Sequence, residues 1–277
     1  MPQRQNTGLK RQQIDKYYTA SHIVEMCTSL FKQNVEFSKS DLCIEPSAGN
    51  GSFIDTIKSL FSSYYFCDIK PEHPEVLEQD YLTIDPSEFD TLGNARIHIL
   101  GNPPFGRQSS LAIKFIKKAC GFANTISFIL PKSFKKDSMK KHFDKNFHLK
   151  LEVDLPDDSF IVNGNSHTVP CVFQIWEKRD YERPQPEVLK PTGFKFVKKN
   201  ENPDISFRRV GVYAGKFCRE IENKSPQSHY FIKLLNKEIT PEIIEKMNNL
   251  NFKNKNDTVA ARSISKQELI KELVGIF

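Results

Sequence analysis

The chain has 277 residues, 27% of them charged and 38% apolar, which is the composition of a water-soluble globular protein with room for one large domain and a smaller one. No apolar stretch is long enough to cross a bilayer, and residues 1–6 lack the apolar core of a signal peptide, so we expect an intracellular protein, cytoplasmic or nuclear. The net charge of +6 is unevenly placed: residues 178–277 carry 20 Lys and Arg against 13 Asp and Glu, and the rest is close to neutral. A nearly neutral domain followed by a basic segment fits an enzyme that binds a polyanion.

The six cysteines are scattered along the chain and contain no Cys-x-x-Cys pair. Cys43, Cys67 and Cys171 sit in apolar runs, which predicts buried thiols in a reducing compartment. The seven histidines show no spacing typical of metal ligands, so we expect no metal site.

The first part of the chain alternates predicted helices and strands. After a polar, flexible segment over residues 1–13, a helix begins near Ser21, capped by Thr19 or Ser21 itself. Apolar periodicity then predicts, in order, strand 42–44, helix 52–61, strands 64–67 and 95–101, helix 111–119, and strands 125–130, 149–153 and 169–176. This alternation predicts a mostly parallel sheet covered on both faces, a Rossmann-like doubly wound α/β domain over residues 14–178.

The pattern changes after a proline-containing linker at residues 181–186. Residues 187–277 predict a smaller α+β segment with the role of substrate recognition, because the basic surplus lies here. Its predicted elements are strands 194–197 and 210–213, a helix starting at Thr240-Pro241, and a last helix with a capping box of Ser265 and Glu268. Arg208 and Arg209, with Lys216 and Arg219 nearby, are cations that we expect to contact the backbone of such a polyanion.

A glycine turn follows the first buried strand, in the run Glu45-Pro46-Ser47-Ala48-Gly49-Asn50-Gly51-Ser52-Phe53. Gly49 and Gly51 allow a tight turn that passes close to a ligand at a helix start, as in the nucleotide sites of doubly wound sheets. The third glycine of a dinucleotide fingerprint is absent, and there is no Gly-Lys-Ser/Thr phosphate loop. The turn therefore favours an adenosyl ligand without a pyrophosphate.

Two aspartates follow this turn. Asp68 closes the next strand, where a carboxylate can accept from ribose hydroxyls, and the alternative is a helix cap. Asp80, beside Tyr81 and Leu82, can accept from an adenine amino group, and the alternative is a turn aspartate.

The most informative run is Asn102-Pro103-Pro104-Phe105, directly after the strand at 95–101. Two prolines cannot continue a sheet, so they fix a backbone whose carbonyls point outward without neighbouring N–H donors. Rigid acceptors beside an aromatic ring suit a planar substrate with an NH2 group, such as a nucleobase or a carboxamide. The alternative is an ordinary loop with a core phenylalanine.

The glycine turn and Asn102-Pro103-Pro104-Phe105 together resemble the class I S-adenosylmethionine-dependent methyltransferases that modify adenine N6. Lys16-Tyr17-Tyr18-Thr19-Ala20 resembles the segment of this family that binds the methionine carboxylate, although the family usually has proline in place of Ala20. The order of these motifs resembles the gamma arrangement of DNA adenine methyltransferases, and the resemblance covers residues 16–177.

The resemblance implies S-adenosylmethionine as cofactor, nucleic acid as partner and no metal. It implies a catalytic set formed by Asn102, Pro103, Pro104 and Phe105. The cofactor-binding residues that it implies are Tyr18, Thr19, Glu45, Pro46, Ser47, Gly49, Gly51, Phe53, Asp68, Ile69, Asp80, Tyr81 and Asn102. For the substrate it implies that Phe105 stacks on the base. Phe160 is either a second stacking ring or a core residue, and Arg107 is either a phosphate contact or part of a solvated basic face.

The leading interpretation is an adenine-N6 methyltransferase of nucleic acid, with DNA modestly preferred. An RNA adenine methyltransferase is the close alternative, and a protein glutamine-N5 methyltransferase is a more distant one, because a carboxamide offers the same NH2. A non-enzymatic binding module with a degenerate methyltransferase fold is the fourth. The sequence does not decide the target, the oligomeric state or the need for a partner subunit.

Overall fold

The computed structural model describes residues 17–92, 95–235, 239–258 and 261–276, so the predicted flexible segment 1–13 and Lys16 lie outside the described residues. The chain divides into two compact units, one ending at Arg183 and the other beginning at Pro184. This division falls inside the segment 181–186 that was predicted to be a linker. No described helix is long and apolar enough to span a membrane.

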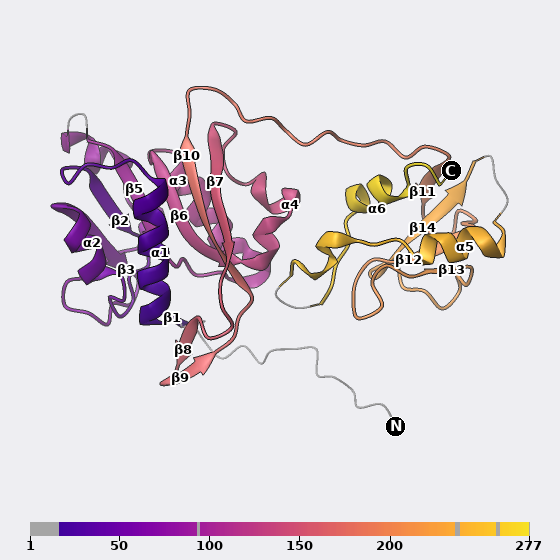
Figure 1. Ribbon diagram of the computed structural model, residues 1–277, viewed down its shortest axis with the longest axis horizontal. Helices are drawn as coiled ribbons and strands as arrows, with labels where there is room; N and C mark the ends of the chain where they lie inside the picture. Colours follow the sequence, from indigo (N-terminus) through magenta and orange to yellow (C-terminus); the bar gives the residue numbers. More distant parts are fainter. Residues whose placement is uncertain (1–16, 93–94, 236–238, 259–260, 277) are drawn as a thin grey trace. The chain divides into compact units, whose positions relative to one another are not determined.

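The first unit is built around a seven-stranded sheet (Figure 1). In chain order its elements are β1 (Tyr18–Thr19), α1 (Ser21–Asn34), β2 (Leu42–Glu45), α2 (Ile54–Leu60), β3 (Ser63–Asp68), β4 (Leu77–Glu78), β5 (Ile97–Gly101), α3 (Ser110–Cys120), β6 (Thr125–Pro131), α4 (Asp137–Lys140), β7 (Phe147–Asp154), β8 (Phe160–Val162), β9 (Asn165–His167) and β10 (Cys171–Lys178). Short 3₁₀ turns lie at Tyr81–Thr83, Pro86–Leu92, Arg107–Ser109 and Lys132–Lys135.

The order of strands in the sheet is β4-β3-β2-β5-β6-β10-β7. The first five are parallel to their neighbours, whereas β10 is antiparallel to both β6 and β7. The predicted Rossmann-like α/β fold is therefore confirmed.

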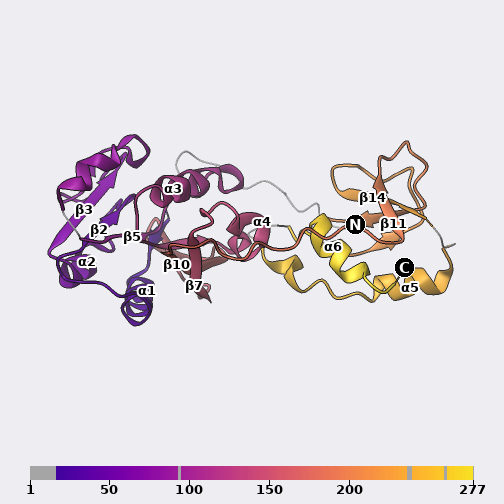
Figure 2. The ribbon, with the colours of Figure 1, turned by 90° about the horizontal axis from the view of Figure 1, so that it is seen from above.

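Alternating side chains of the strands supply two separate cores. On β2, Cys43 belongs to one core and Leu42 and Ile44 to the other, as the two-residue period of a strand requires. Helices α1 and α2 cover the first face and α3 covers the second (Figure 2). Since both faces are covered, the central strands β2 and β6 are buried along their whole length.

The helix ends differ from prediction at two places. The N-cap of α1 is Ala20, in extended backbone and without a side-chain cap, because the Thr19 hydroxyl is turned to Asn102 instead. Helix α2 begins at Ile54 and not at residue 52, because Gly51, with φ of 83°, is still part of the turn. Both predicted caps of α1 are thus wrong.

The predicted buried thiols are confirmed. Cys27, Cys43, Cys67 and Cys171 are buried and free. Burial, together with the charges of Asp68, Glu45 and Asp80, raises the pKa of Cys67 to about 12, so this thiol is unreactive near neutrality.

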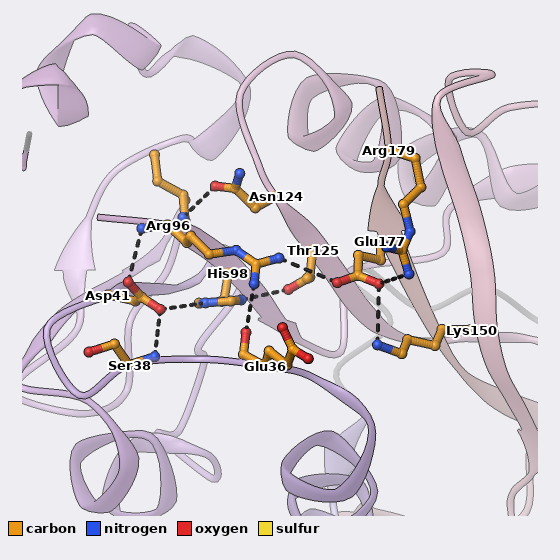
Figure 3. A network of polar contacts seen from close by, with 11 residues as sticks. Glu36, Ser38, Asp41, Arg96, His98, Asn124, Thr125, Lys150, Glu177 and Arg179 are labelled. Carbon is orange, nitrogen blue, oxygen red and sulfur yellow. Dashed lines mark hydrogen bonds and ion pairs between the residues drawn. The ribbon is translucent and has the colours of Figure 1, made fainter. Parts of the chain in front are cut away.

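A polar network closes the amino-terminal edge of the parallel strands (Figure 3). Buried His98 bonds to Thr125 Oγ1 at 2.8 Å and to Asp41 at 3.2 Å, and Asp41 also accepts from the backbone N–H of Ser38 and Arg96. Burial lowers the pKa of His98 in spite of Asp41, so the ring is neutral at physiological pH. This histidine fixes the strands at the edge opposite the carboxyl ends and has no place in the site described below.

Arg183, which belongs to the predicted linker, is an anchor of the first unit. Its guanidinium lies 5.3 Å from the ring of Trp176 and donates to four backbone carbonyls, those of Lys140, Phe143, Asp144 and Phe147. It thereby ties the segment after α4 to the start of β7.

We expect Arg183→Ala to destabilise the first unit by about 2 kcal/mol, since four backbone carbonyls, three of them in part-buried bonds, lose a charged donor. Thermal unfolding followed by circular dichroism measures this as a fall in Tm. Arg183→Lys should lose nearly as much stability, because a lysine ammonium lacks the planar, branched donors with which the guanidinium bonds to four carbonyls. An unchanged Tm in both variants would contradict the anchoring role.

The second unit is a four-stranded antiparallel sheet with two helices. Its elements are β11 (Phe194–Val197), β12 (Ile205–Arg208), β13 (Phe217–Cys218), β14 (His229–Leu234), α5 (Pro241–Asn248), a 3₁₀ turn (Lys253–Asn256) and α6 (Lys266–Leu273), with strand order β11-β14-β12-β13. The strand at 194–197, the Thr240 cap and the capping box of Ser265 and Glu268 are confirmed.

The predicted strand at 210–213 is wrong. Val210 makes one isolated bridge to Ser263, and the chain then turns at Gly211, with φ of 103°, leaving Val212 and Tyr213 exposed. The apolar run at 229–234, which was not predicted, forms the central strand β14 instead.

Candidate active site

The candidate site lies where the order of parallel strands reverses. The chain passes from β2 outward to β3 and β4 and then returns to β5 on the other side of β2. In open α/β sheets the carboxyl ends at such a switch point form a ligand crevice. Here these ends carry Glu45, Asp68 and Asn102.

A cavity of about 250 Å³ opens at this edge of the sheet. Its lining residues are Tyr17, Tyr18, Thr19, Glu45, Pro46, Ser47, Ala48, Gly49, Asn50, Ser52, Phe53, Asp68, Ile69, Lys70, Glu72, Asp80, Tyr81, Leu82, Asn102, Pro103, Pro104, Phe105, Leu111 and Phe115. All predicted catalytic residues and all predicted cofactor-binding residues except Gly51 are brought together here.

The glycine turn is held by Asp68. The N–H of Gly49 donates to Asp68 Oδ2 at 3.0 Å, and the N–H of Lys70 donates to Oδ1 at 2.8 Å. Asp68 is therefore not a helix cap, and its carboxylate keeps lone pairs for further donors at the cavity wall. Gly51 has a packing role: a Cβ there would lie 2.8 Å from His73 Cγ, so only glycine fits.

Asp80 combines both predicted roles. Its Oδ1 accepts from the N–H of Leu82 at 2.9 Å and so starts the 3₁₀ turn, as a turn aspartate does. The residue nevertheless lines the cavity beside the buried ring of Tyr81.

Asn102 has the most telling geometry of the site. Its side-chain Nδ2 donates to the carbonyl of Tyr17 at 3.2 Å and to the hydroxyl of Thr19 at 3.3 Å. Its backbone carbonyl accepts from Ser47 Oγ at 3.0 Å. Both acceptors lie on the Nδ2 side, and this determines which end of the side-chain amide is nitrogen and which is oxygen. The buried Oδ1 is left without a donor.

The loop after Asn102 adds a second acceptor and a ring. Among the described residues no donor is bonded to the carbonyl of Pro103, whereas the carbonyl of Phe105 accepts from the N–H of Leu111 at 3.2 Å and so ties the loop to α3. Gly106, with φ of 66°, lets the chain turn so closely that a Cβ would lie 2.8 Å from Leu111 Cγ. The loop is therefore rigid at the cavity.

Glu45 places a buried carboxyl under the same cavity. It is 2% exposed, and its Oε2 has no hydrogen-bond partner. Burial, and then repulsion by Asp68, raises the pKa of Glu45 to about 8. The hydroxyl of Tyr81 is a third buried polar group of this wall without a partner. Such groups are costly unless a ligand satisfies them, so the wall fits a polar ligand that carries positive charge.

Four predicted substrate residues are not brought to this cavity. Phe160 is fully buried in strand β8, 6.1 Å from the ring of Tyr17, which makes it a core residue and not a stacking platform. Arg107 is exposed and does not line the cavity. Arg208 and Arg209 belong to the second unit.

Several lining residues were not predicted. Tyr17 supplies the carbonyl that orients Asn102, and Glu72 accepts from the hydroxyl of Tyr18, a residue that was predicted. Tyr17 lies inside the quoted run Lys16–Ala20, so its proximity to the site was available from the sequence. Its contact with Asn102 was not, because it depends on a strand pairing between residues far apart in the chain.

The described residues contain no group of three or more His, Cys, Asp or Glu side chains arranged to hold a metal.

Comparison with known proteins gives matches over the first unit. Residues 55–187 match a family model described as the EDM2 methyltransferase-like domain. The type II methyltransferase M.HincII of Haemophilus influenzae is 30% identical over 108 residues, which is 37% of this chain and 19% of that protein. The chain thus spans about a fifth of the length of the curated relatives that it matches.

Solved structures with a similar fold are more distant in sequence. A methyltransferase subunit of a type I restriction-modification system from Streptococcus thermophilus is 14% identical, with a TM-score of 0.44 over 60% of this chain and 46% of that one. The 23S rRNA methyltransferase ErmE is 13% identical, with a TM-score of 0.43 over 60% of this chain and 71% of that one.

The first unit has a Rossmann-like α/β fold and is similar over residues 55–187 to class I methyltransferases, the class whose cofactor is S-adenosylmethionine. More particularly, residues 55–187 are similar to the EDM2 methyltransferase-like domain.

Proposed function

We propose that this chain transfers a methyl group from S-adenosylmethionine to the N6 amino group of adenine in nucleic acid, with DNA modestly preferred. The observation that carries the proposal is the buried Oδ1 of Asn102, an oriented acceptor without a donor on a residue that lines the cavity. A substrate NH2 group supplies the missing donor. The preference for DNA rests on the order of the motifs along the chain.

The residues of the cavity wall fit the cofactor. The Glu45 carboxyl suits the ammonium group of its methionine part, and Asp68 keeps lone pairs for ribose hydroxyls. Asp80, Tyr81 and Leu82 suit an adenine ring. When bound, the sulfonium supplies a methyl group activated for transfer.

The chain's own part in the reaction is to prepare the nucleophile. The lone pair of an adenine amino group is delocalised into the ring, so the nitrogen attacks poorly. Asn102 Oδ1 and the Pro103 carbonyl accept one N–H each, which favours a tetrahedral nitrogen with a localised lone pair. The new C–N bond forms as the C–S bond breaks, and the surplus proton of the nitrogen is released to water.

Phe105 gives the base a ring on which to stack, since it lines the cavity next to both acceptors. In a duplex the target base must leave the stack to reach them, and the unstacking costs a few kcal/mol. Single-stranded or locally melted substrates avoid this cost.

The test is transfer of labelled methyl from S-adenosylmethionine to duplex DNA, single-stranded DNA, structured RNA and a glutamine-containing protein, followed by mass spectrometry of the hydrolysed products. We expect N6-methyladenine in one of the DNA substrates. N6-methyladenine in RNA alone moves the proposal to the alternative substrate. Methylglutamine, or no transfer to any nucleic acid by a chain that binds the cofactor, overturns it.

A further inference from the structure

The second unit contains a hollow of its own, about 660 Å³ in volume. It is lined by residues of the paired strands β11 and β14, of the turn at 198–200 and by the first residue of α6. Its lining residues are Phe196, Val197, Lys198, Lys199, Asn200, Pro226, His229, Tyr230, Phe231 and Lys266.

The floor of the hollow is aromatic. The rings of Phe196 and Tyr230 meet edge to face with centroids 5.6 Å apart. The ammonium group of Lys266 lies 4.6 Å from the centroid of Phe196 and 5.8 Å from that of Tyr230. His229 does not add charge, because burial lowers its pKa and its ring bonds to Ser228 and to the carbonyl of Ser225.

Three lysines surround this floor, and no carboxylate of the described residues pairs with them. Lys199 Nζ donates to the carbonyl of Glu222 at 2.6 Å, which is a neutral partner. Other lysines of the unit are neutralised, such as Lys233 by Asp204 at 2.7 Å and Lys224 by Glu220 at 2.8 Å. The positive charges of Lys198, Lys199 and Lys266, which line the hollow, are therefore not neutralised by a carboxylate of the described residues.

Carboxylates next to the hollow are occupied elsewhere. The side chain of Glu201 accepts from the backbone N–H of Lys198 at 2.8 Å, and that of Glu268 accepts from the N–H of Ser265 at 2.7 Å as part of the capping box. Neither lines the hollow. The unit as a whole, residues 184–277, carries 17 Lys and Arg against 11 Asp and Glu.

The arginines predicted from sequence are less suited to a ligand. Arg208 is used within the unit, since Nε donates to the carbonyl of Val210 at 2.7 Å and NH1 to Ser228 Oγ at 3.2 Å. Arg209 donates to the carbonyl of Gln227 at 2.9 Å and lies 5.4 Å from the ring of Tyr230. Both therefore stabilise the fold of this unit around the hollow.

We propose that this hollow binds a nucleic-acid strand, with Lys198, Lys199 and Lys266 on its phosphates and the aromatic floor under its sugars or bases. The inference rests on the proposed function and names the surface through which the second unit holds the substrate. Three lysines without a carboxylate partner, one of them over aromatic rings, suit a polyanion that also carries planar groups.

The experiment is fluorescence anisotropy with the full chain and a labelled single-stranded oligodeoxynucleotide, over a series of salt concentrations. We expect the triple variant Lys198→Gln, Lys199→Gln, Lys266→Gln to bind at least tenfold more weakly. The slope of log K against log salt should fall by about 2, because each phosphate of a single strand that a lysine neutralises adds about 0.7 to the slope.

The control variant removes the same charge outside the hollow: Lys246→Gln, Lys253→Gln, Lys271→Gln, three exposed lysines that do not line it. Its salt slope should stay within a few tenths of the parent value. Equal slopes in the two triple variants overturn the assignment of the hollow, even if the chain methylates DNA. Conversely, a selective loss in the first variant supports the hollow even if no methyl transfer is found, which separates this inference from the proposed activity.

Discussion

Replacing Asn102 by alanine is expected to lower the rate of methyl transfer by roughly 10²–10⁴-fold, the range for losing a positioned acceptor or donor of a transition state. The affinity for S-adenosylmethionine should stay nearly unchanged, because Glu45, Asp68 and Asp80 remain in the cavity wall. Single-turnover methylation measures the first quantity and isothermal titration the second. Full activity in this variant contradicts the role of Asn102 as the amino-group acceptor.

Asn102→Asp provides the matched comparison. The variant keeps an acceptor oxygen at the position of Oδ1. It also replaces the Nδ2 donor by a second oxygen, which would face the Tyr17 carbonyl that accepts from Nδ2 at 3.2 Å in the parent chain. We expect a rate of methyl transfer between those of the parent chain and the alanine variant. The bonds from residue 102 to Tyr17 and Thr19 should be lost. A rate equal to that of the alanine variant would show that orientation by Tyr17 matters more than the acceptor atom itself.

Glu45→Gln is expected to remove the pH dependence of cofactor affinity. In the free chain the pKa of Glu45 is raised to about 8, whereas a bound cation requires the carboxylate. The affinity of the parent chain should therefore rise with pH by up to tenfold per unit below about pH 8 and then level off. In the glutamine variant the affinity for S-adenosylmethionine should not change with pH over this range. At pH 8 it should be roughly 10–100-fold weaker than in the parent chain, which corresponds to the loss of one charged hydrogen bond.

The same substitution has an opposite effect on stability without cofactor. Between the ordinary glutamate pKa and about pH 8 the folded chain binds more protons than the unfolded one, so this residue's contribution to stability falls as pH rises. Glu45→Gln should thus raise Tm at pH 8 more than at pH 5. Glu25→Gln, on the exposed face of α1, should keep the parent profile in both measurements; identical pH profiles for Glu45→Gln and the parent would contradict the role given to Glu45.

The strands of the sheet could be predicted from the sequence because each strand is marked by residues that are neighbours in the chain. Apolar runs such as 125–130 signal buried strands through composition alone, and turn residues such as Gly49 and Gly51 mark the breaks between elements. The residues at the carboxyl ends of β2, β3 and β5 converge for a simple reason: parallel neighbours end at the same edge. Their chemical roles remain predictions.

Features that depend on distant pairing were not predictable in this way. Phe160 looked like a loop aromatic, but pairing of β8 with β1 buries it. The run 210–213 has strand-forming residues, but Gly211, with φ of 103°, turns the chain there. The network around His98 joins positions 36 to 179 along the chain, and no local period reveals it.

The pairing of β1 with β8 has a consequence for when activity can arise. Tyr18 lies opposite Ile161, so the segment that orients the Asn102 amide is positioned by residues about 140 places further along the chain. Closing so long a loop is slow compared with forming local helices. A chain leaving the ribosome with Asn102 already made, but β8 not yet made, lacks the support that aims its acceptor. The geometry that the proposed methyl transfer needs is therefore completed late in folding, after the sheet that carries Asn102 has formed.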